Sequence, residues 1–153
     1  MNKIKICLAA SAGGHLTELM QLSGFYEKHE HFFISDKRTN AIELRKKKNK
    51  VYFVKVPRRN PINLIINFIQ SLKIFLNEKP DVILSTGADV AIPILLIGKI
   101  FEKKIIFIES VARINEPSLS GKIIYPFSDL FFIQWKKNKK FFPKGIFAGS
   151  VFD

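Results

Sequence analysis

The sequence contains one cysteine, Cys7, among its 153 residues. A single cysteine cannot form an internal disulfide, so a disulfide-rich fold is excluded, and its place in an apolar run predicts a buried small hydrophobe in a reducing compartment. Long hydrophobic runs are also lacking, because the longest, Val90–Ile97, ends at Gly98, whereas a membrane-spanning helix needs roughly 20 apolar residues. The start of the chain has too short an apolar stretch for a signal peptide. Any membrane contact is therefore expected to be peripheral.

Acidic residues are few relative to basic ones: 13 Asp and Glu against 25 Lys and Arg, for a net charge of +12. This excess predicts an anionic partner, whether nucleic acid, anionic lipid or a phosphorylated substrate. The basic residues cluster at 45–50, 58–59 and 136–140. Aromatic residues alternate with basic ones mainly around Trp135–Phe142, which is too little for a nucleic-acid surface. We therefore expect an anionic membrane surface and a phosphorylated ligand, and no nucleic acid.

Strand-like and helix-like segments alternate almost from end to end, and hydrophobic residues make up 47% of the chain. Short apolar runs that end at turns are typical of buried parallel strands. Strands are expected at 4–9, 31–35, 51–56, 81–85, 104–108 and 130–134, with a last short run from 146. The alternation predicts right-handed crossovers and a single α/β domain over residues 1–153, with a doubly wound, Rossmann-like parallel sheet.

Two predicted helices begin with capping signals. Asn40 with Glu43 forms a candidate capping box for the helix before the third strand. Asn60 and Pro61 suit the N-cap and the first position of a helix that runs to about Asn77.

The helix 61–77 has an unusually wide apolar arc. Ten Ile, Leu and Phe residues cover it apart from one narrow polar stripe of Asn63, Asn67, Gln70, Ser71 and Asn77. A surface helix needs an apolar arc of only roughly 100°, so this helix is either nearly all buried or in contact with a membrane or a partner. Arg58 and Arg59 precede its N-terminus, where the helix dipole disfavours cations and a lipid phosphate would relieve the conflict. We expect Arg58 and Arg59 to contact a membrane.

Three polar loops follow strand ends, at 11–15, 86–89 and 109–116. Ligands of doubly wound sheets bind at the carboxyl ends of the strands, so the three loops are expected to form one cleft. Asp89, in the second loop, is expected to cap the helix that follows it.

The first loop combines Ser11 with two glycines, Gly13 and Gly14, and ends at His15. The glycines let the backbone approach a ligand, and the helix start favours an anion such as a diphosphate. The spacing matches neither a Walker loop nor the dinucleotide fingerprint, and a tight turn with no ligand remains the alternative. His15 is the candidate general base, because an imidazole accepts a sugar hydroxyl proton near neutral pH. The alternative role is a hydrogen bond to a neighbouring loop.

The third loop places an acid, a hydroxyl, a cation and an amide within seven residues: Glu109, Ser110, Arg113 and Asn115. A solvated loop would have a similar composition, but the position at a strand end favours a binding or catalytic site. Neither a metal ion nor a cofactor is expected.

Three motifs of the chain resemble one known family. They are Ser11-Ala12-Gly13-Gly14-His15, the segment Pro80–Ala88, and Ile108–Ser110 followed by Pro117–Lys122. In this order they resemble the PssD-type subunits of bacterial capsule and exopolysaccharide synthesis. Those subunits are similar to the anchoring subunit of the eukaryotic two-part transferase that adds the second N-acetylglucosamine to dolichyl diphosphate. More distantly, they resemble the amino-terminal half of MurG.

The resemblance implies a GT-B glycosyltransferase divided between two polypeptides. This chain would be equivalent to the N-terminal, acceptor domain and would hold a polyprenyl-diphosphate-linked acceptor at the inner, cytoplasmic face of the membrane. A second subunit would hold most of the UDP-sugar. The residues that the resemblance implies for the cleft are Gly13, Gly14 and His15 at the acceptor diphosphate, Thr86 and Gly87 beside them, and Glu109 near the sugar.

Two departures accompany the resemblance. The eukaryotic subunit usually begins with a membrane-spanning segment, which this sequence lacks. The ending Phe147–Asp153 falls where a fused enzyme would pass into its second domain. The chain is therefore expected to be inactive or weakly active alone.

Two other functions stay open at the level of sequence. Asp36 ends the second strand roughly 20 residues after the glycine turn, where an acid binds a ribose in nucleotide-dependent oxidoreductases, and Lys37-Arg38 would suit a 2′-phosphate. The third possibility is a non-catalytic scaffold that recruits the partner to the membrane. A scaffold would tolerate substitution of both His15 and Glu109.

Overall fold

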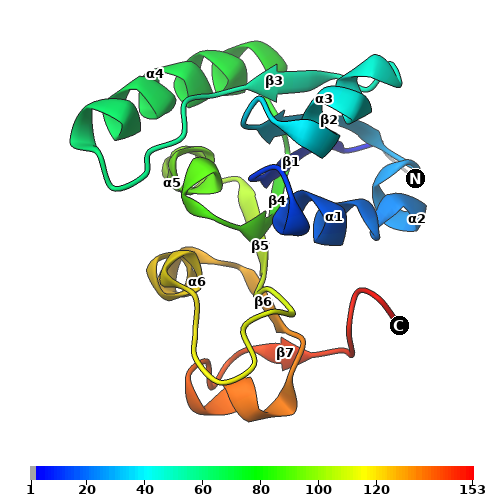
Figure 1. The fold of residues 1–153 in the computed structure, drawn as a ribbon, viewed down its shortest axis with the longest axis vertical. Helices are drawn as coiled ribbons and strands as arrows, with labels where there is room; N and C mark the ends of the chain where they lie inside the picture. Colours follow the sequence, from blue (N-terminus) through cyan, green and yellow to red (C-terminus); the bar gives the residue numbers. More distant parts are fainter. Residues whose placement is uncertain (1–2) are drawn as a thin grey trace.

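A computed structural model describes residues 3–153, which form one seven-stranded sheet flanked by helices (Figure 1). Neighbouring strands are parallel throughout, in the order β3-β2-β1-β4-β5-β6-β7. The strands are β1 (Lys5–Ala10), β2 (Glu30–Ser35), β3 (Val51–Phe53), β4 (Val82–Gly87), β5 (Lys104–Ile108), β6 (Leu130–Ile133) and β7 (Ile146–Phe147). The order reverses between β1 and β4, as in Rossmann-like sheets. The predicted doubly wound fold is confirmed.

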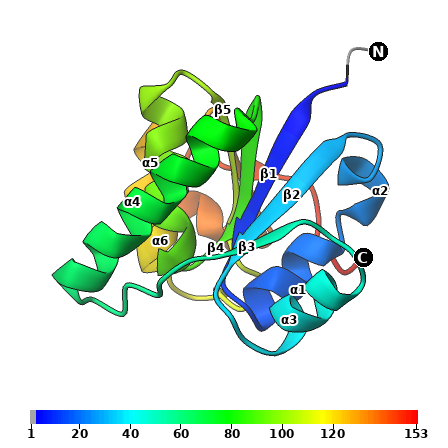
Figure 2. The same cartoon turned by 90° about the horizontal axis from the view of Figure 1, so that it is seen from above.

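The helices lie on both faces of the sheet (Figure 2). One face carries α1 (Gly14–Met20), α2 (Ser23–Tyr26) and α3 (Thr39–Lys46). The other carries α4 (Pro61–Glu78), α5 (Ile92–Ile100) and α6 (Leu119–Ile124). Three short 3-10 helices complete the fold: η1 (Asp89–Ala91), η2 (Tyr125–Phe127) and η3 (Lys136–Lys140). Within residues 3–153, no helix has the length and apolar character needed to cross a membrane.

Strand β1 lies at the centre of the sheet and is buried on both faces. Cys7 and Ala9 join the hydrophobic cluster beneath α4, α5 and α6, whereas Ile6 and Leu8 join the cluster beneath α1 and α3. A strand buried on both faces has a continuous apolar run, which is the pattern that predicted it. Cys7 is fully buried, as expected, and this burial raises the pKa of its thiol well above the usual value.

The predicted N-cap of α4 is confirmed. The side-chain oxygen of Asn60 accepts hydrogen bonds from the backbone amides of Ile62 and Asn63, at 2.9 and 3.2 Å. The third strand was expected at 51–56 but ends at Phe53. Beyond Phe53, the Val54 amide still donates a hydrogen bond to the Ser35 carbonyl of β2.

The predicted capping box at Asn40 is wrong. Helix α3 begins at Thr39, its N-cap is Arg38, and no side chain caps it. The Asn40 side chain instead bonds to the glycine turn: it accepts from the Gly13 amide at 2.8 Å and donates to the Gly13 carbonyl at 3.0 Å. A residue 27 positions away in the sequence therefore takes the bond that a local cap would have used.

Helix α4 packs with Asn67 and Ser71 of its polar stripe inward, whereas Asn77 is exposed. Asn67 and Ser71 are fully buried. The Asn67 amide nitrogen donates to the carbonyls of Lys55 and Val90, at 2.8 and 3.2 Å, and its oxygen accepts from the Ser71 hydroxyl at 2.8 Å. Because these buried polar groups are hydrogen-bonded, burying them costs little.

The C-terminal end of α4 is held by a buried carboxylate. Glu78 is 6% exposed and contacts Lys5, Lys50 and Tyr52. Burial alone would raise the pKa of Glu78, but the hydrogen bonds from Lys5, Lys50 and Tyr52 outweigh it and lower this pKa from 4.5 to about 2. The carboxylate therefore stays ionised down to acidic pH.

The opposite side of α4 is exposed and apolar. Its exposed residues are Ile62, Leu64, Ile65, Ile66, Ile69, Leu72 and Leu76, here called the α4 apolar face. Ile62 is 68% exposed and Ile65 is 58% exposed. Of the two arrangements predicted for this helix, near-complete burial is wrong. The wide arc faces outward, where contiguous apolar surface marks a membrane or protein contact.

Candidate functional site

The first two predicted loops meet where the strand order reverses. Residues 11–15, here called the glycine turn, follow β1, and residues 86–89 follow the neighbouring β4. Gly13 has φ 101° and Gly87 has φ 116°, in the left-handed region that glycine adopts without steric cost. A Cβ atom on Gly87 would lie 3.3 Å from the His15 ring. Glycine at position 87 therefore permits the close approach of the two loops.

Side chains already occupy two amides of the glycine turn. The Ala12 amide donates to Asp36 at 2.7 Å, and the Gly13 amide donates to Asn40 at 2.8 Å. Burial opposes ionisation of Asp36, but hydrogen bonds from Arg38 and Ala12 hold the pKa of Asp36 below its usual value. The Asp36 carboxylate, 2% exposed, thus supports the turn and is not free to bind a ribose hydroxyl. This geometry removes the basis for a nucleotide-dependent oxidoreductase.

His15 and Thr86 join the two loops by reciprocal hydrogen bonds. The Nδ1 atom of His15 lies 2.9 Å from the Thr86 carbonyl, and the Thr86 hydroxyl donates to the His15 carbonyl at 2.6 Å. Since a carbonyl only accepts, this bond assigns the imidazole proton to Nδ1 and leaves Nε2 as a proton acceptor. His15 therefore makes the hydrogen bond to a neighbouring loop that a structural role predicts, and it also keeps Nε2 available, as a general base requires.

Glu109, directly after β5, is buried, with only 1% exposure. Its carboxylate accepts from the backbone amides of Ser110 and Ser118, at 3.1 and 3.2 Å. Burial raises the pKa of Glu109 above its usual value, although the bonds from Ser118 and Ser110 partly offset this. A side chain on Gly121 would collide with this carboxylate. Glu109 thus holds the start of α6, and Gly121 makes room for it.

Sequence reasoning missed two buried residues next to Glu109, namely Glu18 and Gln134. The Ser110 hydroxyl donates to Glu18 at 2.7 Å, and Gln134 donates to Glu18 and to the Glu109 carbonyl, at 3.2 and 3.0 Å. The Gln134 oxygen accepts from the Val151 amide at 2.9 Å. This network joins α1, the third loop, β6 and the C-terminal segment. Glu18 lies in α1 among the apolar residues Leu16, Leu19 and Met20. An acidic residue among these apolar positions was the only signal in the sequence that Glu18 is part of the site.

The other predicted residues of the third loop lie at its exposed tip. Arg113 pairs with Glu116 at 3.4 Å, and its carbonyl accepts from Asn138 at 2.8 Å. Asn115 accepts from Lys137 at 2.8 Å. The structure therefore brings Ser110 together with α1 but places Arg113 and Asn115 toward η3. Ser11, in the glycine turn, contributes its carbonyl to the first turn of α1.

The predicted capping role of Asp89 is wrong. The N-cap of η1 is Ala88, with no side-chain cap. Asp89 instead accepts from the Arg58 amide at 2.8 Å, which links the second loop to the segment before α4. Arg58 and Arg59 are exposed and have φ 45° and 58°. Left-handed backbone is costly for residues with a Cβ atom, so the Asp89 bond helps to stabilise this turn.

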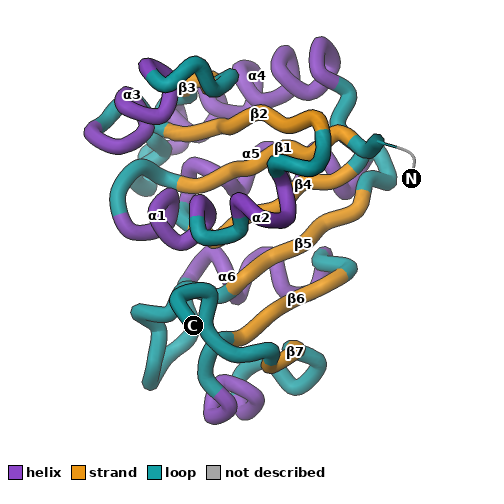
Figure 3. Tube along the Cα trace, turned by 90° about the vertical axis from the view of Figure 1, so that its right-hand side faces the viewer, coloured by secondary structure: helices purple, strands orange, loops and turns teal. Residues whose placement is uncertain are grey.

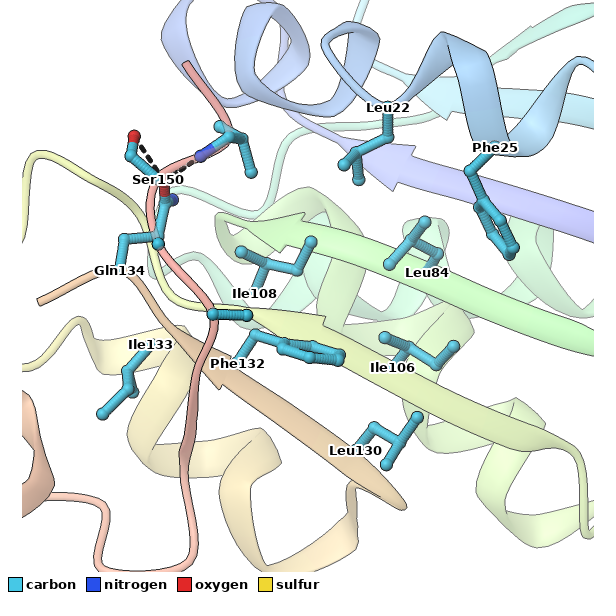
Figure 4. Close-up of a pocket in the computed structure, with 13 residues that line it drawn as sticks. Leu22, Phe25, Leu84, Ile106, Ile108, Leu130, Phe132, Ile133, Gln134 and Ser150 are labelled. Carbon is cyan, nitrogen blue, oxygen red and sulfur yellow. Dashed lines mark hydrogen bonds between the residues drawn. The ribbon is translucent and has the colours of Figure 1, made fainter. Parts of the chain in front are cut away.

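A second apolar surface lies on the opposite side of the sheet from α4. On the face seen in Figure 3, α1 and α2 lie beside β1 and β4, and no described helix covers β5 and β6. A groove of about 430 Å³ follows this open area, with Phe25, Leu84, Ile106, Leu130 and Phe132 among its lining residues (Figure 4). The C-terminal segment 148–151 forms its other wall. We call it the β5–β6 groove.

Comparison with known proteins agrees with the motifs. A family model described as oligosaccharide biosynthesis protein Alg14 like matches residues 6–151. The UDP-N-acetylglucosamine transferase subunit ALG14 of Homo sapiens is 29% identical over 179 residues, covering 97% of this chain and 83% of the human protein. Its counterpart in Candida albicans is 27% identical, covering 89% of this chain and 73% of that protein.

Solved structures share the fold at low identity. MurG from Acinetobacter baumannii matches with a TM-score of 0.72 and 13% identity, covering 97% of this chain and 44% of MurG. UDP-N-acetylglucosamine 2-epimerase from Rickettsia bellii matches with a TM-score of 0.78 and 16% identity, covering 99% of this chain and 46% of the epimerase. The chain spans less than half the length of these two solved chains. The sequence motifs, the family match and the sheet order agree, and the chain belongs to the Alg14-like family of oligosaccharide biosynthesis proteins.

Proposed function

We propose that this chain is the acceptor-binding, membrane-associating subunit of a two-component glycosyltransferase. The complex transfers a sugar from a UDP-sugar to a polyprenyl-diphosphate-linked glycan in capsule or exopolysaccharide biosynthesis. Two facts support the subunit role. The relatives are named as transferase subunits, and the three motifs resemble PssD-type subunits.

The observation that carries the proposal is the α4 apolar face. Seven Ile and Leu side chains are exposed along one helix that starts beside Arg58 and Arg59. Apolar side chains that enter the lipid boundary, flanked by cations that contact anionic headgroups, hold a protein peripherally on a membrane. The net charge of +12 favours the same surface. We place the protein on the inner, cytoplasmic face of the cell membrane, where a lipid-linked acceptor meets a UDP-sugar.

The cleft between β1 and β4 supplies the acceptor side of the reaction. In the proposed step, an acceptor hydroxyl oxygen bonds to the anomeric carbon of the sugar, the bond to UDP breaks, and the hydroxyl proton passes to Nε2 of His15. Gly13 and Gly14 leave room for the acceptor to approach the backbone. Thr86 fixes the imidazole tautomer through its carbonyl. Glu109 acts as a positioning residue, because its buried carboxylate holds the start of α6.

The partner subunit docks at the β5–β6 groove. An open apolar sheet face of this size is costly in water and marks an interface. The groove adjoins the C-terminal segment, and the Gln134 network connects that segment to Ser110 in the cleft. Partner binding at the groove would therefore be coupled to the cleft that the partner completes.

The test measures transfer from a radiolabelled UDP-sugar to a polyprenyl-diphosphate-linked acceptor, with each subunit alone and with both. The partner to supply in this assay is a chain of similar size with a glycine-rich, nucleotide-binding carboxyl half, sought in the neighbouring reading frames. This chain alone holds only the acceptor side, and orientation of both substrates supplies much of the rate. We expect little transfer by this chain alone and activity when both subunits are present. Robust transfer by this chain alone would overturn the two-component proposal.

A double variant tests the docking surface. Phe25→Ser with Leu130→Ser removes two half-exposed side chains of the groove, 45% and 38% exposed. Assembly with the partner, measured by co-purification, should fall at least tenfold while membrane binding stays unchanged. Unimpaired assembly would move the interface elsewhere on the chain.

A further inference from the structure

A basic pocket lies beside the cleft, at the carboxyl ends of β2 and β3. Its volume is about 350 Å³, and the residues that line it include Lys37, Arg38, Lys55 and Arg58, together with Asp36. Arg38 pairs with Asp36. Among residues 3–153, Lys37, Lys55 and Arg58 form no ion pair. Four cationic residues line this concavity and outnumber the two carboxylates beside them, those of Asp36 and Asp89, so a local positive potential attracts an anion.

The segment that carries Lys55 and Arg58 is fixed on both sides. The Lys55 amide donates to Gln70 of α4 at 2.7 Å, and its carbonyl accepts from Asn67 at 2.8 Å. The Arg58 amide donates to Asp89 at 2.8 Å. These bonds hold the backbone in place before any ligand arrives, including the left-handed φ of 45° at Arg58. A pre-positioned site loses less entropy on binding than a mobile one.

Two neighbours of the pocket indicate which anion it binds. Asn63, in the first turn of α4, lines the pocket, and the α4 apolar face begins at Ile62 in the same turn. On the other side, Arg38 donates to the Ala12 carbonyl of the glycine turn at 3.2 Å. The pocket therefore lies between the first turn of α4 and the glycine turn. A ligand with a phosphate head and a long apolar tail would fit both surfaces.

We propose that this pocket binds the phosphate or diphosphate group of a membrane lipid, with the lipid tail along the α4 apolar face. This inference rests on the proposed function and deepens it, since the same group links the lipid to the acceptor sugar. Lys37, Lys55 and Arg58 bind the phosphate oxygens through charge-assisted hydrogen bonds. Arg38, held by Asp36, marks the boundary between this pocket and the glycine turn. The attached sugar then extends toward His15.

Calorimetric titration of the purified chain tests the pocket with three probes: inorganic diphosphate, farnesyl diphosphate and farnesol. The pocket variant is Lys55→Gln with Arg58→Gln. Its matched control is Lys46→Gln with Lys47→Gln at the C-terminal end of α3, which removes the same charge from two exposed lysines that do not line the pocket. All four side chains are exposed, so the fold should survive, and equal melting temperatures check this. Lys37→Gln serves as a second pocket variant.

We expect the pocket variant to bind farnesyl diphosphate at least tenfold more weakly and the control to stay within twofold. Farnesyl diphosphate should bind more tightly than inorganic diphosphate, because the tail contacts α4. Equal affinity for the two would overturn the lipid assignment and leave a site for free phosphate. Equal loss in the pocket and control variants would overturn the pocket itself. Neither failure affects sedimentation of the chain with vesicles, which tests the proposed membrane role separately.

Discussion

Replacing Ile65 and Ile69 with serine removes two outward side chains from the centre of the α4 apolar face. They are 58% and 53% exposed in the folded chain. Much of their surface already contacts water, so the free energy of unfolding should change by only about 0.5 kcal/mol, as for other surface substitutions. In a membrane, however, the same surface would leave water. The substitutions therefore separate the stability of the fold from its affinity for lipid.

The expected loss of affinity follows from the exposed area. Complete burial of an isoleucine side chain stabilises by about 2 kcal/mol, and roughly half of each side chain is available to the lipid. Two substitutions should therefore cost about 2 kcal/mol, which corresponds to about a 30-fold lower partition coefficient. The assay is sedimentation with vesicles of phosphatidylcholine and phosphatidylglycerol. High salt should weaken binding of the unaltered chain without abolishing it, because charge and insertion both contribute.

The groove variant, Phe25→Ser with Leu130→Ser, is the matched control. It removes a similar amount of exposed apolar surface from the other face of the sheet. If it lost as much vesicle binding as the α4 variant, the membrane contact would be unspecific. If the α4 variant bound vesicles within about twofold of the unaltered chain, the energetic argument above would be refuted.

Four further predictions concern stability and catalysis. Asn67→Ala removes hydrogen bonds to three partners and should lower the free energy of unfolding by about 3 kcal/mol, measured in urea. Asn77→Ala on the exposed side should change it by less than about 0.5 kcal/mol. The pKa of Glu78 is lowered to about 2, so its contribution to stability is complete above pH 4.5 and is lost as pH falls toward 2. Glu78→Gln should therefore flatten the acid part of the stability profile, measured by urea unfolding at each pH. His15→Ala should lower kcat on the order of 100-fold, and Gly14→Val, which has open space around its Cβ position, should block acceptor use but not partner assembly. If His15→Ala lowered kcat by less than about threefold, His15 would have a structural role only.

Local signals in the sequence were sufficient for the framework of the fold. The apolar run of β1 and the cap at Asn60 each depend on residues within a few positions, and both predictions are confirmed. The capping box at Asn40 failed because its hydrogen-bond partner is Gly13, far away in the sequence. Asp89 failed for the same reason, since it accepts from the amide of Arg58. The capping role of a residue can be predicted when all of its possible hydrogen-bond partners are local. It cannot be predicted when the tertiary fold supplies a better partner.

Helix α4 shows why the direction of an amphipathic helix is harder to predict than its period. The spacing of Asn67 and Ser71 defined the polar stripe correctly, but a stripe does not state which side faces the sheet. That choice depends on the carbonyls of Lys55 and Val90, which lie on other elements and satisfy Asn67 where it is buried. With the polar groups satisfied inside, the helix keeps its isoleucines and leucines outside, at a cost in water that the fold itself does not recover. An apolar neighbour would recover that cost, which is why we propose that the exposed side of α4 contacts a membrane.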